Sequence, residues 1–155
     1  MEKTNVMRLL EQKKIKFNSY CYEDTGAVNG MEVAKVLGQD YHKVFKTLVT
    51  VAKSKKNYVF VIPVNDELDL KKAAKAVGEK AVEMLKQKEL LPLTGYIHGG
   101  CSPVGMKKQF KTVIDASATN FDYIYVSAGK VGMQIKINPN DLIKAVNGVF
   151  EDISK

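Results

Sequence analysis

Cysteine, histidine and long apolar runs are the scarcest features of this 155-residue chain. The two cysteines, Cys21 and Cys101, form no CxxC pair, which fits a reducing compartment and argues against a disulfide scaffold or a zinc cluster. The two histidines, His42 and His98, lack metal-ligand spacing, so we interpret them as surface or loop residues. No apolar run reaches ~18 residues, and the acid-containing start is unlike a signal peptide. We therefore expect a cytoplasmic protein that spans no membrane and binds no metal or cofactor.

Positive charge exceeds negative charge in this sequence. Lysine and arginine number 24 against 17 acids, which gives a net charge of +7. Such an excess attracts polyanions, and nucleic acid is the commonest of these in the cytoplasm. A solubility surface explains the same excess, so charge alone leaves both interpretations open. The length and the 45% hydrophobic content predict one domain over residues 1–155, with a core of its own.

Local patterns predict an α+β fold. Helices are expected after the capping residues Thr4, Asn29 and Asn138 and at residues 69–77 and 82–90. Strands are expected at residues 16–22, 44–52, 58–64, 111–115, 122–128, 131–137 and 148–153. The turns at residues 54–57 and at Gly129–Lys130 predict two hairpins. Helices in bunches and strands in hairpins favour a single domain with a mixed, mostly antiparallel, barrel-like sheet and flanking helices.

Lys46 is the first candidate for chemistry. It lies in VFKTLV, within a strand whose near-continuous apolar character predicts burial on both faces. An ammonium placed there costs several kcal/mol unless it meets a partner or water. A cleft meets that need. A lysine at a strand end that extends to solvent meets it as well, and the strand pattern alone does not decide between them.

The stretch HGGCSPVGMKK, residues 98–108, is the second candidate. Gly99, Gly100 and Gly105 permit positive φ and a close approach of ligand to backbone, and Pro103 stiffens the turn. Successive N–H groups in such a loop can hold an anion or a carbonyl oxygen. Neither GxGxxG nor GxxxxGK[ST] occurs, so this is no nucleotide phosphate loop of either kind.

Three lysines, Lys107, Lys108 and Lys111, follow this loop and are candidates for phosphate contacts. A loop that only turns a corner, followed by a solvated charge run, accounts for the same residues.

Other arrangements give weaker signals. The acids Asp66, Glu67 and Asp69 sit where a helix begins, and capping explains them better than acid–base catalysis. Cys101 and Ser102 would be nucleophiles only beside a base, and the sequence places none there. Four strand-spaced tyrosines are interpreted as core or rim: Tyr20, Tyr22, Tyr123 and Tyr125.

Four segments in order carry a resemblance to a known family. KTNVMRLLEQKKIKF, VFKTLV, GGCSPVGMKKQF and YVSAGKVGMQI, at these separations, resemble the YbaK/EbsC family, closest to its Cys-tRNA(Pro) deacylase branch. VFKTLV alone is weak, but the ordered set is strong and covers essentially the whole chain. The resemblance implies a YbaK-like editing domain, similar to the one associated with prolyl-tRNA synthetase.

The implied activity is trans-editing, in which cysteine mistakenly attached to tRNA(Pro) is removed by cleavage of the aminoacyl ester. A synthetase pocket cannot sufficiently reject an amino acid of nearly equal volume, so a second site clears the error. The family implies that the substrate's own thiol attacks its carbonyl to give a thiolactone. Cys101 is then part of the loop wall. The partners implied are the acceptor end of tRNA(Pro) and prolyl-tRNA synthetase.

The family's motifs assign roles to residues of this chain. Lys46 is the central active-site residue, with Phe45 and Thr47 beside it in the substrate site. Tyr20 and Ser127 also match substrate-binding positions. Gln134 occupies a position where many relatives carry an acid, so no role that needs a carboxylate transfers to it.

The GxxxP loop of the family matches Gly99, Gly100, Cys101, Ser102 and Pro103, whose backbone is expected to hold the aminoacyl group and the terminal adenosine. Two alternatives remain open at this stage. One is editing of another small aminoacyl-tRNA such as Ala-tRNA(Pro). The other is a non-catalytic tRNA-binding module that kept the fold.

Overall fold

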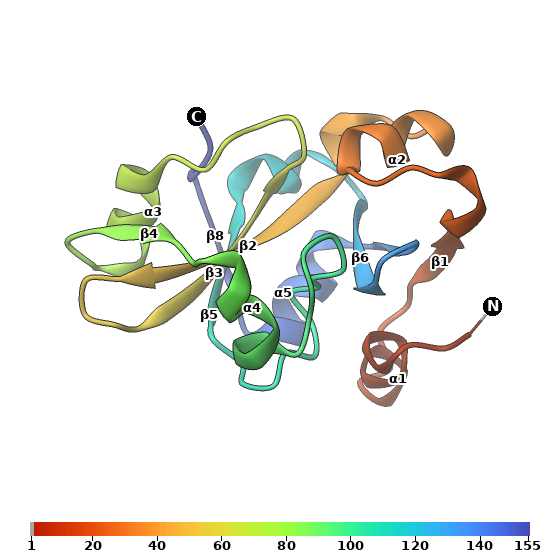
Figure 1. Cartoon of the computed structure of the whole chain (residues 1–155). Helices are drawn as coiled ribbons and strands as arrows, with labels where there is room; N and C mark the ends of the chain where they lie inside the picture. Colours follow the sequence, from red (N-terminus) through yellow and green to blue (C-terminus); the bar gives the residue numbers. More distant parts are fainter. Residues whose placement is uncertain (1) are drawn as a thin grey trace.

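The computed structural model describes residues 2–155 (Figure 1). Its α-helices are α1 (Asn5–Gln12), α2 (Gly30–Val36), α3 (Leu70–Val77), α4 (Gln87–Thr94) and α5 (Pro139–Val146). Its strands are β1 (Asn18–Cys21), β2 (Phe45–Ala52), β3 (Asn57–Pro63), β4 (Val82–Met84), β5 (Lys111–Asp115), β6 (Ile124–Lys130), β7 (Met133–Ile137) and β8 (Val149–Glu151). No helix of the described residues is long and apolar enough to cross a bilayer.

The strands form two sheets. One has the order β1-β7-β6 and the other β4-β2-β3-β5-β8. Pairing is antiparallel except between β3 and β5 and between β5 and β8, so the predicted α+β fold with mostly antiparallel strands is confirmed. An isolated parallel bridge, Val44 to Tyr125, links the start of β2 to β6. In Figure 1, α2 lies above the region where the two sheets approach each other.

β3 is buried on both faces, as its apolar sequence predicts. Val59 and Val61 face the main core, which α1, α5 and both sheets enclose. Phe60 and Ile62 face a second core under α3. All four side chains are fully buried, so this strand forms the shared wall of two cores.

The predicted helix starts are confirmed by their caps. Thr4 Oγ1 accepts from Met7 N at 3.3 Å, and Asn138 Oδ1 accepts from Asn140 N at 2.8 Å. Asn29 and Glu32 form the predicted capping box, with Asn29 Oδ1 accepting from Glu32 N at 3.0 Å and Asn29 Nδ2 donating to Glu32 Oε1 at 2.7 Å. These caps fix where each helix begins.

Two sequence predictions are wrong. Residues 82–90 are not one helix: Val82 and Met84 pair with the end of β2 as strand β4, and α4 begins at Gln87 and continues past Pro92. Main-chain pairing of these residues with β2 overrides their helix propensity. The second hairpin does not turn at residues 129–130, because β6 continues through Lys130 after a bulge that begins at Ser127.

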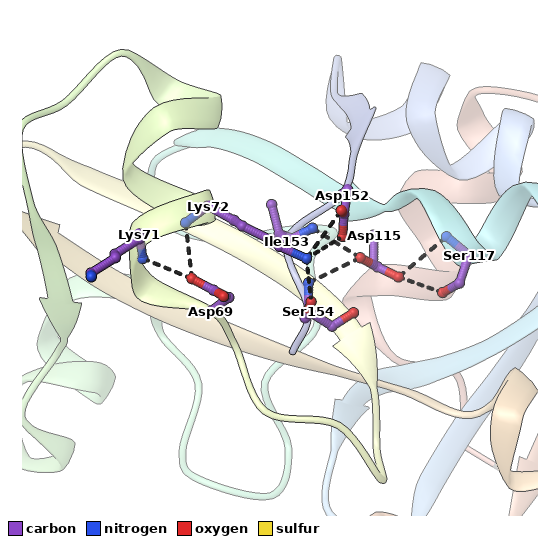
Figure 2. Close-up of polar contacts among 8 residues, drawn as sticks. All are labelled: Asp69, Lys71, Lys72, Asp115, Ser117, Asp152, Ile153 and Ser154. Carbon is purple, nitrogen blue, oxygen red and sulfur yellow. Dashed lines mark hydrogen bonds and ion pairs between the residues drawn. The ribbon is translucent and has the colours of Figure 1, made fainter.

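A buried carboxylate fixes the end of the chain (Figure 2). Asp115 is 4% exposed, and its Oδ1 accepts from the backbone N–H groups of Ile153 at 3.0 Å and Ser154 at 3.2 Å. Its Oδ2 accepts from the hydroxyl of Ser117 at 2.5 Å and from the N–H of the same residue at 3.2 Å. Four donors satisfy both oxygens, which makes burial of the charge tolerable.

Candidate active site

A cavity of about 530 Å³ lies where the two sheets meet. Its walls come from the loop before α2 and from α2 itself, from the first half of β2, from the glycine loop, and from β6 and β7. The predicted site residues that line it are Phe45, Lys46, Thr47, Gly99, Cys101, Ser127 and Gln134. Segments distant in the sequence therefore converge on one cavity of a size suited to a small ligand.

The cavity runs along an unpaired edge of β2. β4 covers this edge only from Thr50 to Ala52, and the N–H of Leu85 extends the pairing to the carbonyl of Val49. Main-chain groups of alternate residues point to the same edge of a strand, so those of Thr47 face the cavity without a strand partner. A ligand can therefore bind here by main-chain hydrogen bonds.

Lys46 places a positively charged ammonium group at the cavity. It lies on the face of β2 that carries Val44 and Leu48, both of which also line the cavity. Its side chain is half-buried, and no carboxylate of residues 2–155 lies within 4.0 Å of its ammonium. The interpretation of Lys46 as a cleft residue rather than a strand-end lysine in solvent therefore agrees with its placement.

Three predicted residues form one row across the smaller sheet. Ser127 pairs with Gln134, and Gln134 pairs with Tyr20, so all three side chains share a face. Ser127 and Gln134 reach the cavity. Tyr20 does not line it, but contacts the cavity residue Tyr125 edge to face, with ring centroids 5.9 Å apart.

Hydrogen bonds orient the side chains of Ser127 and Gln134. Ser127 Oγ accepts from the N–H of Gly129 at 3.1 Å, which leaves its hydroxyl hydrogen free to donate into the cavity. The amide of Gln134 is 4% exposed and exchanges two hydrogen bonds with Gln39, at 2.6 and 3.2 Å. Gln134 is therefore a satisfied wall residue that needs no ligand to complete its bonding.

The glycine loop divides its residues between the cavity and the fold. Gly99, with φ of +89°, lines the cavity. Gly100 does not: a Cβ there would lie 3.0 Å from the backbone nitrogen of Val131, so its small size serves packing against the β6–β7 turn. Ser102 and Pro103 are buried, and Ser102 Oγ accepts from the N–H of Val104 at 3.2 Å, so these two residues shape the loop from inside.

Cys101 is a poor nucleophile in this environment. Its side chain is 9% exposed, and burial raises the pKa of its thiol to about 12. A thiol attacks only as thiolate, and burial in apolar surroundings keeps this one protonated at neutral pH. No three His, Cys, Asp or Glu side chains of residues 2–155 gather as a metal site.

The three lysines expected to contact phosphates lie outside the cavity, and several residues that line the cavity were not predicted to do so. Lys107, Lys108 and Lys111 are exposed and do not line the cavity. Tyr125 was interpreted as core or rim, and His98 as a surface or loop residue; both line the cavity. The remaining lining residues, to which no site role was assigned from the sequence, are Tyr22, Val28, Asn29, Gly30, Met31, Val33, Val44, Leu48, Val64, Leu90 and Val126.

Comparison with known proteins places the chain in a family. Residues 26–145 match the family described as "Aminoacyl-tRNA editing domain". A protein of Enterococcus faecalis named "Putative Cys-tRNA(Pro)/Cys-tRNA(Cys) deacylase EbsC" is 48% identical over 154 residues, which are 99% of this chain and 94% of that protein.

A partial sequence relative and a solved structure also resemble this chain. A "Proline--tRNA ligase" of Shouchella clausii is 29% identical over 110 residues, which are 64% of this chain and 19% of that protein. A solved structure, "Crystal structure of a putative trans-editing enzyme for prolyl tRNA synthetase", has a TM-score of 0.83 at 22% identity, covers 99% of each chain and supports the fold. Identity of 48% over nearly the full length supports the predicted enzyme class, an aminoacyl-tRNA deacylase. The chain belongs to the aminoacyl-tRNA editing domain family, as its resemblance to the YbaK/EbsC family implied.

Proposed function

We propose that this protein is a trans-editing hydrolase that removes cysteine from mischarged Cys-tRNA(Pro). The observation that carries the proposal is a cavity in which, among residues 2–155, Lys46 has no ion-pair partner, one edge of β2 is uncovered and no side chain is an activated nucleophile. Such a site can bind and orient an aminoacyl ester, and a substrate that carries its own nucleophile then needs no reactive group from the protein. Cysteine supplies that group, and the name of the Enterococcus faecalis relative points to the same amino acid.

In the proposed reaction the sulfur of the substrate cysteine attacks its own ester carbonyl carbon. A carbon–sulfur bond forms, the bond from the carbonyl carbon to the ribose oxygen breaks, and the thiol proton ends on that ribose oxygen. The products are a cyclic thiolactone and tRNA with a free 3′ end, so no oxidant or protein nucleophile is needed. Holding thiol and carbonyl in the reactive geometry can supply a large part of the rate.

The lining residues take roles that follow from their bonding. Lys46 stabilises negative charge that develops on the ester as it is attacked, and the Ser127 hydroxyl donates a hydrogen bond to the substrate. The main chain of Thr47 and of Gly99 binds the aminoacyl group. Cys101 forms part of the wall and takes no part in bond making.

The nucleic-acid part of the substrate is proposed to be tRNA(Pro). The match to part of a proline–tRNA ligase and the fold shared with a trans-editing enzyme support a working association with prolyl-tRNA synthetase. Lys107, Lys108 and Lys111 remain proposed contacts to acceptor-stem phosphates, which are recognised largely by charge and shape.

The test is deacylation of Cys-tRNA(Pro) by the purified protein with product identification. The expected result is release of the thiolactone, or of cysteine derived from it, from Cys-tRNA(Pro). Ser-tRNA(Pro) should not be cleaved, because serine has the same shape without the thiol. Equal cleavage of both esters would contradict thiol assistance. Cleavage of Ala-tRNA(Pro) in preference to both would favour the alternative substrate.

A further inference from the structure

A second group of chemically active side chains lies beside the cavity. Tyr123 is flanked by two lysines: the ammonium of Lys136 lies 3.9 Å from its ring centroid and that of Lys43 lies 4.4 Å away. The Lys43 ammonium also donates to the Tyr123 hydroxyl at 3.4 Å. We call Tyr123, Lys43 and Lys136 the Tyr123 cluster. All three side chains are half-buried, so their positions are restricted while their polar atoms remain reachable.

The register of the smaller sheet places this cluster on the face that carries the catalytic cavity. Lys136 pairs across the strands with Tyr125, one row along from the pair Ser127 and Gln134. Residues two apart on a strand share a face, so Tyr123 continues the line of Tyr125 and Ser127. The Tyr123 and Tyr125 rings meet edge to face with centroids 5.6 Å apart. The cluster therefore adjoins the cavity.

The two lysines of the Tyr123 cluster form no direct ion pair with the described residues. No carboxylate of residues 2–155 lies within 4.0 Å of the ammonium of Lys43 or Lys136. Asp40, close to Lys43 in the chain, pairs with His42 at 2.9 Å instead. The Lys43 hydrogen bond, followed by the charges of the two lysines, lowers the pKa of the Tyr123 hydroxyl. Two like charges held on one ring favour an anion between them.

We propose that the Tyr123 cluster binds the phosphodiester backbone of the single-stranded acceptor end as it leaves the cavity. This inference rests on the proposed function, since it assumes that the aminoacyl ester occupies the cavity. Lys43 and Lys136 contact phosphates, and Tyr123 holds both lysines in place. Tyr123 and Lys136 also line a second groove together with Glu11 and Asp141, whose carboxylates repel a phosphodiester, so the strand follows the cavity side of the cluster. Lys43 and Lys136 are therefore positioning residues for the substrate.

The first test is the salt dependence of tRNA(Pro) binding, measured by fluorescence anisotropy on the full chain. Each single-strand phosphate contact contributes ~0.7 to the slope of log Kd against log salt. The double variant Lys43→Gln/Lys136→Gln is expected to lose about 1.4 from that slope. Lys53→Gln/Lys56→Gln is the matched control, because Lys53 lies roughly 23 Å along the chain from Lys46 at ~3.3 Å per residue.

The second test is kinetic and separates this inference from the proposed function. With Cys-tRNA(Pro), the double variant should raise KM roughly tenfold and leave kcat within about twofold. With 3′-cysteinyl-adenosine, which has the ester but no phosphodiester, it should match the wild type, which also shows that it is folded. Failure of the wild type to cleave either ester would refute the proposed function. The slopes of log Kd against log salt would still test whether the Tyr123 cluster binds phosphates.

Three results would overturn the inference. One is an unchanged slope and KM for the double variant. Another is an equal loss in the Lys53 and Lys56 control, which would indicate a general charge effect. The third is displacement of tRNA by inorganic phosphate at the same concentration of phosphate groups, which would indicate a site for free phosphate.

Discussion

Val44 pairs with Tyr125 in an isolated parallel bridge between the two sheets. Lys46 follows Val44 by two residues, and Ser127 follows Tyr125 by two residues. Each therefore lies on the same face of its strand as the bridge residue before it. β2 and β6 share no further pairing there, and the cavity lies between them. The bridge thus places the candidate cation and the candidate hydroxyl donor on opposite walls of one site.

Ser127→Ala should lower kcat/KM for Cys-tRNA(Pro) about tenfold, because the substrate loses a hydrogen bond that contributes ~1.4 kcal/mol. Ser127→Thr keeps the hydroxyl on a residue that suits a strand and should retain most activity. Steady-state kinetics of both variants check this. Equal activity of Ser127→Ala and wild type would remove Ser127 from the site.

Cys101→Ala should retain deacylation within about twofold, because the thiol is protonated and forms only wall. With its pKa raised to about 12 by burial, Cys101 should also resist iodoacetamide near pH 8, while the exposed Cys21 reacts. Peptide mass spectrometry of the alkylated native protein reads this directly. Complete loss of activity in Cys101→Ala, with Lys46 intact, would contradict thiol assistance by the substrate.

Thr47→Val should keep activity and increase stability. The Thr47 hydroxyl is buried and has no hydrogen-bond partner among residues 2–155, and it lies on the core side of β2 with Phe45 and Val49. Valine preserves the shape of the side chain and removes the unpaired hydroxyl. The free energy of unfolding measured in urea should therefore rise by about 1 kcal/mol. A large loss of activity would mean that the side chain, and not the main chain, binds substrate.

Asp115→Asn should destabilise the protein by about 2 kcal/mol near pH 7, because buried backbone donors lose a charged acceptor. Burial alone would raise the pKa of Asp115, but hydrogen bonds from Ser117, Ile153 and Ser154 outweigh it and lower the pKa from its ordinary value near 3.8. This contribution to stability is therefore full above the unfolded pKa and is lost as pH falls through the lower native pKa.

Urea unfolding of wild type and Asp115→Asn between about pH 7 and pH 3 checks this dependence. The difference between the two proteins should narrow toward the acid end. A difference that stays constant with pH would mean that Asp115 acts through shape and not through charge.

Local signals in the sequence were enough to predict most elements. The caps at Thr4, Asn29 and Asn138 and the apolar runs of β2 and β3 each act over a few residues, and the structure confirms them. The strand at Val82 could not be predicted in this way, because only its pairing with β2 makes it a strand.

The site was predicted where a motif marked it and missed where tertiary contacts build it. VFKTLV and the glycine loop indicated Lys46 and Gly99. Tyr125 begins the segment YVSAGKVGMQI but was interpreted as core or rim, and nothing local distinguishes Met31 from a core residue; both line the cavity through the meeting of two sheets and α2. The role of Gly100 in packing on Val131 likewise depends on a contact distant in sequence.

The most direct measurement compares wild type and Lys46→Ala on Cys-tRNA(Pro), with Ala-tRNA(Pro) and Pro-tRNA(Pro) alongside and Lys53→Ala as the control variant. Rapid loss of cysteine alone, reduced at least ~100-fold in Lys46→Ala and unchanged in Lys53→Ala, is the predicted result. No cleavage of any of the three esters by a folded wild-type protein that still binds tRNA would contradict the account and favour a binding module.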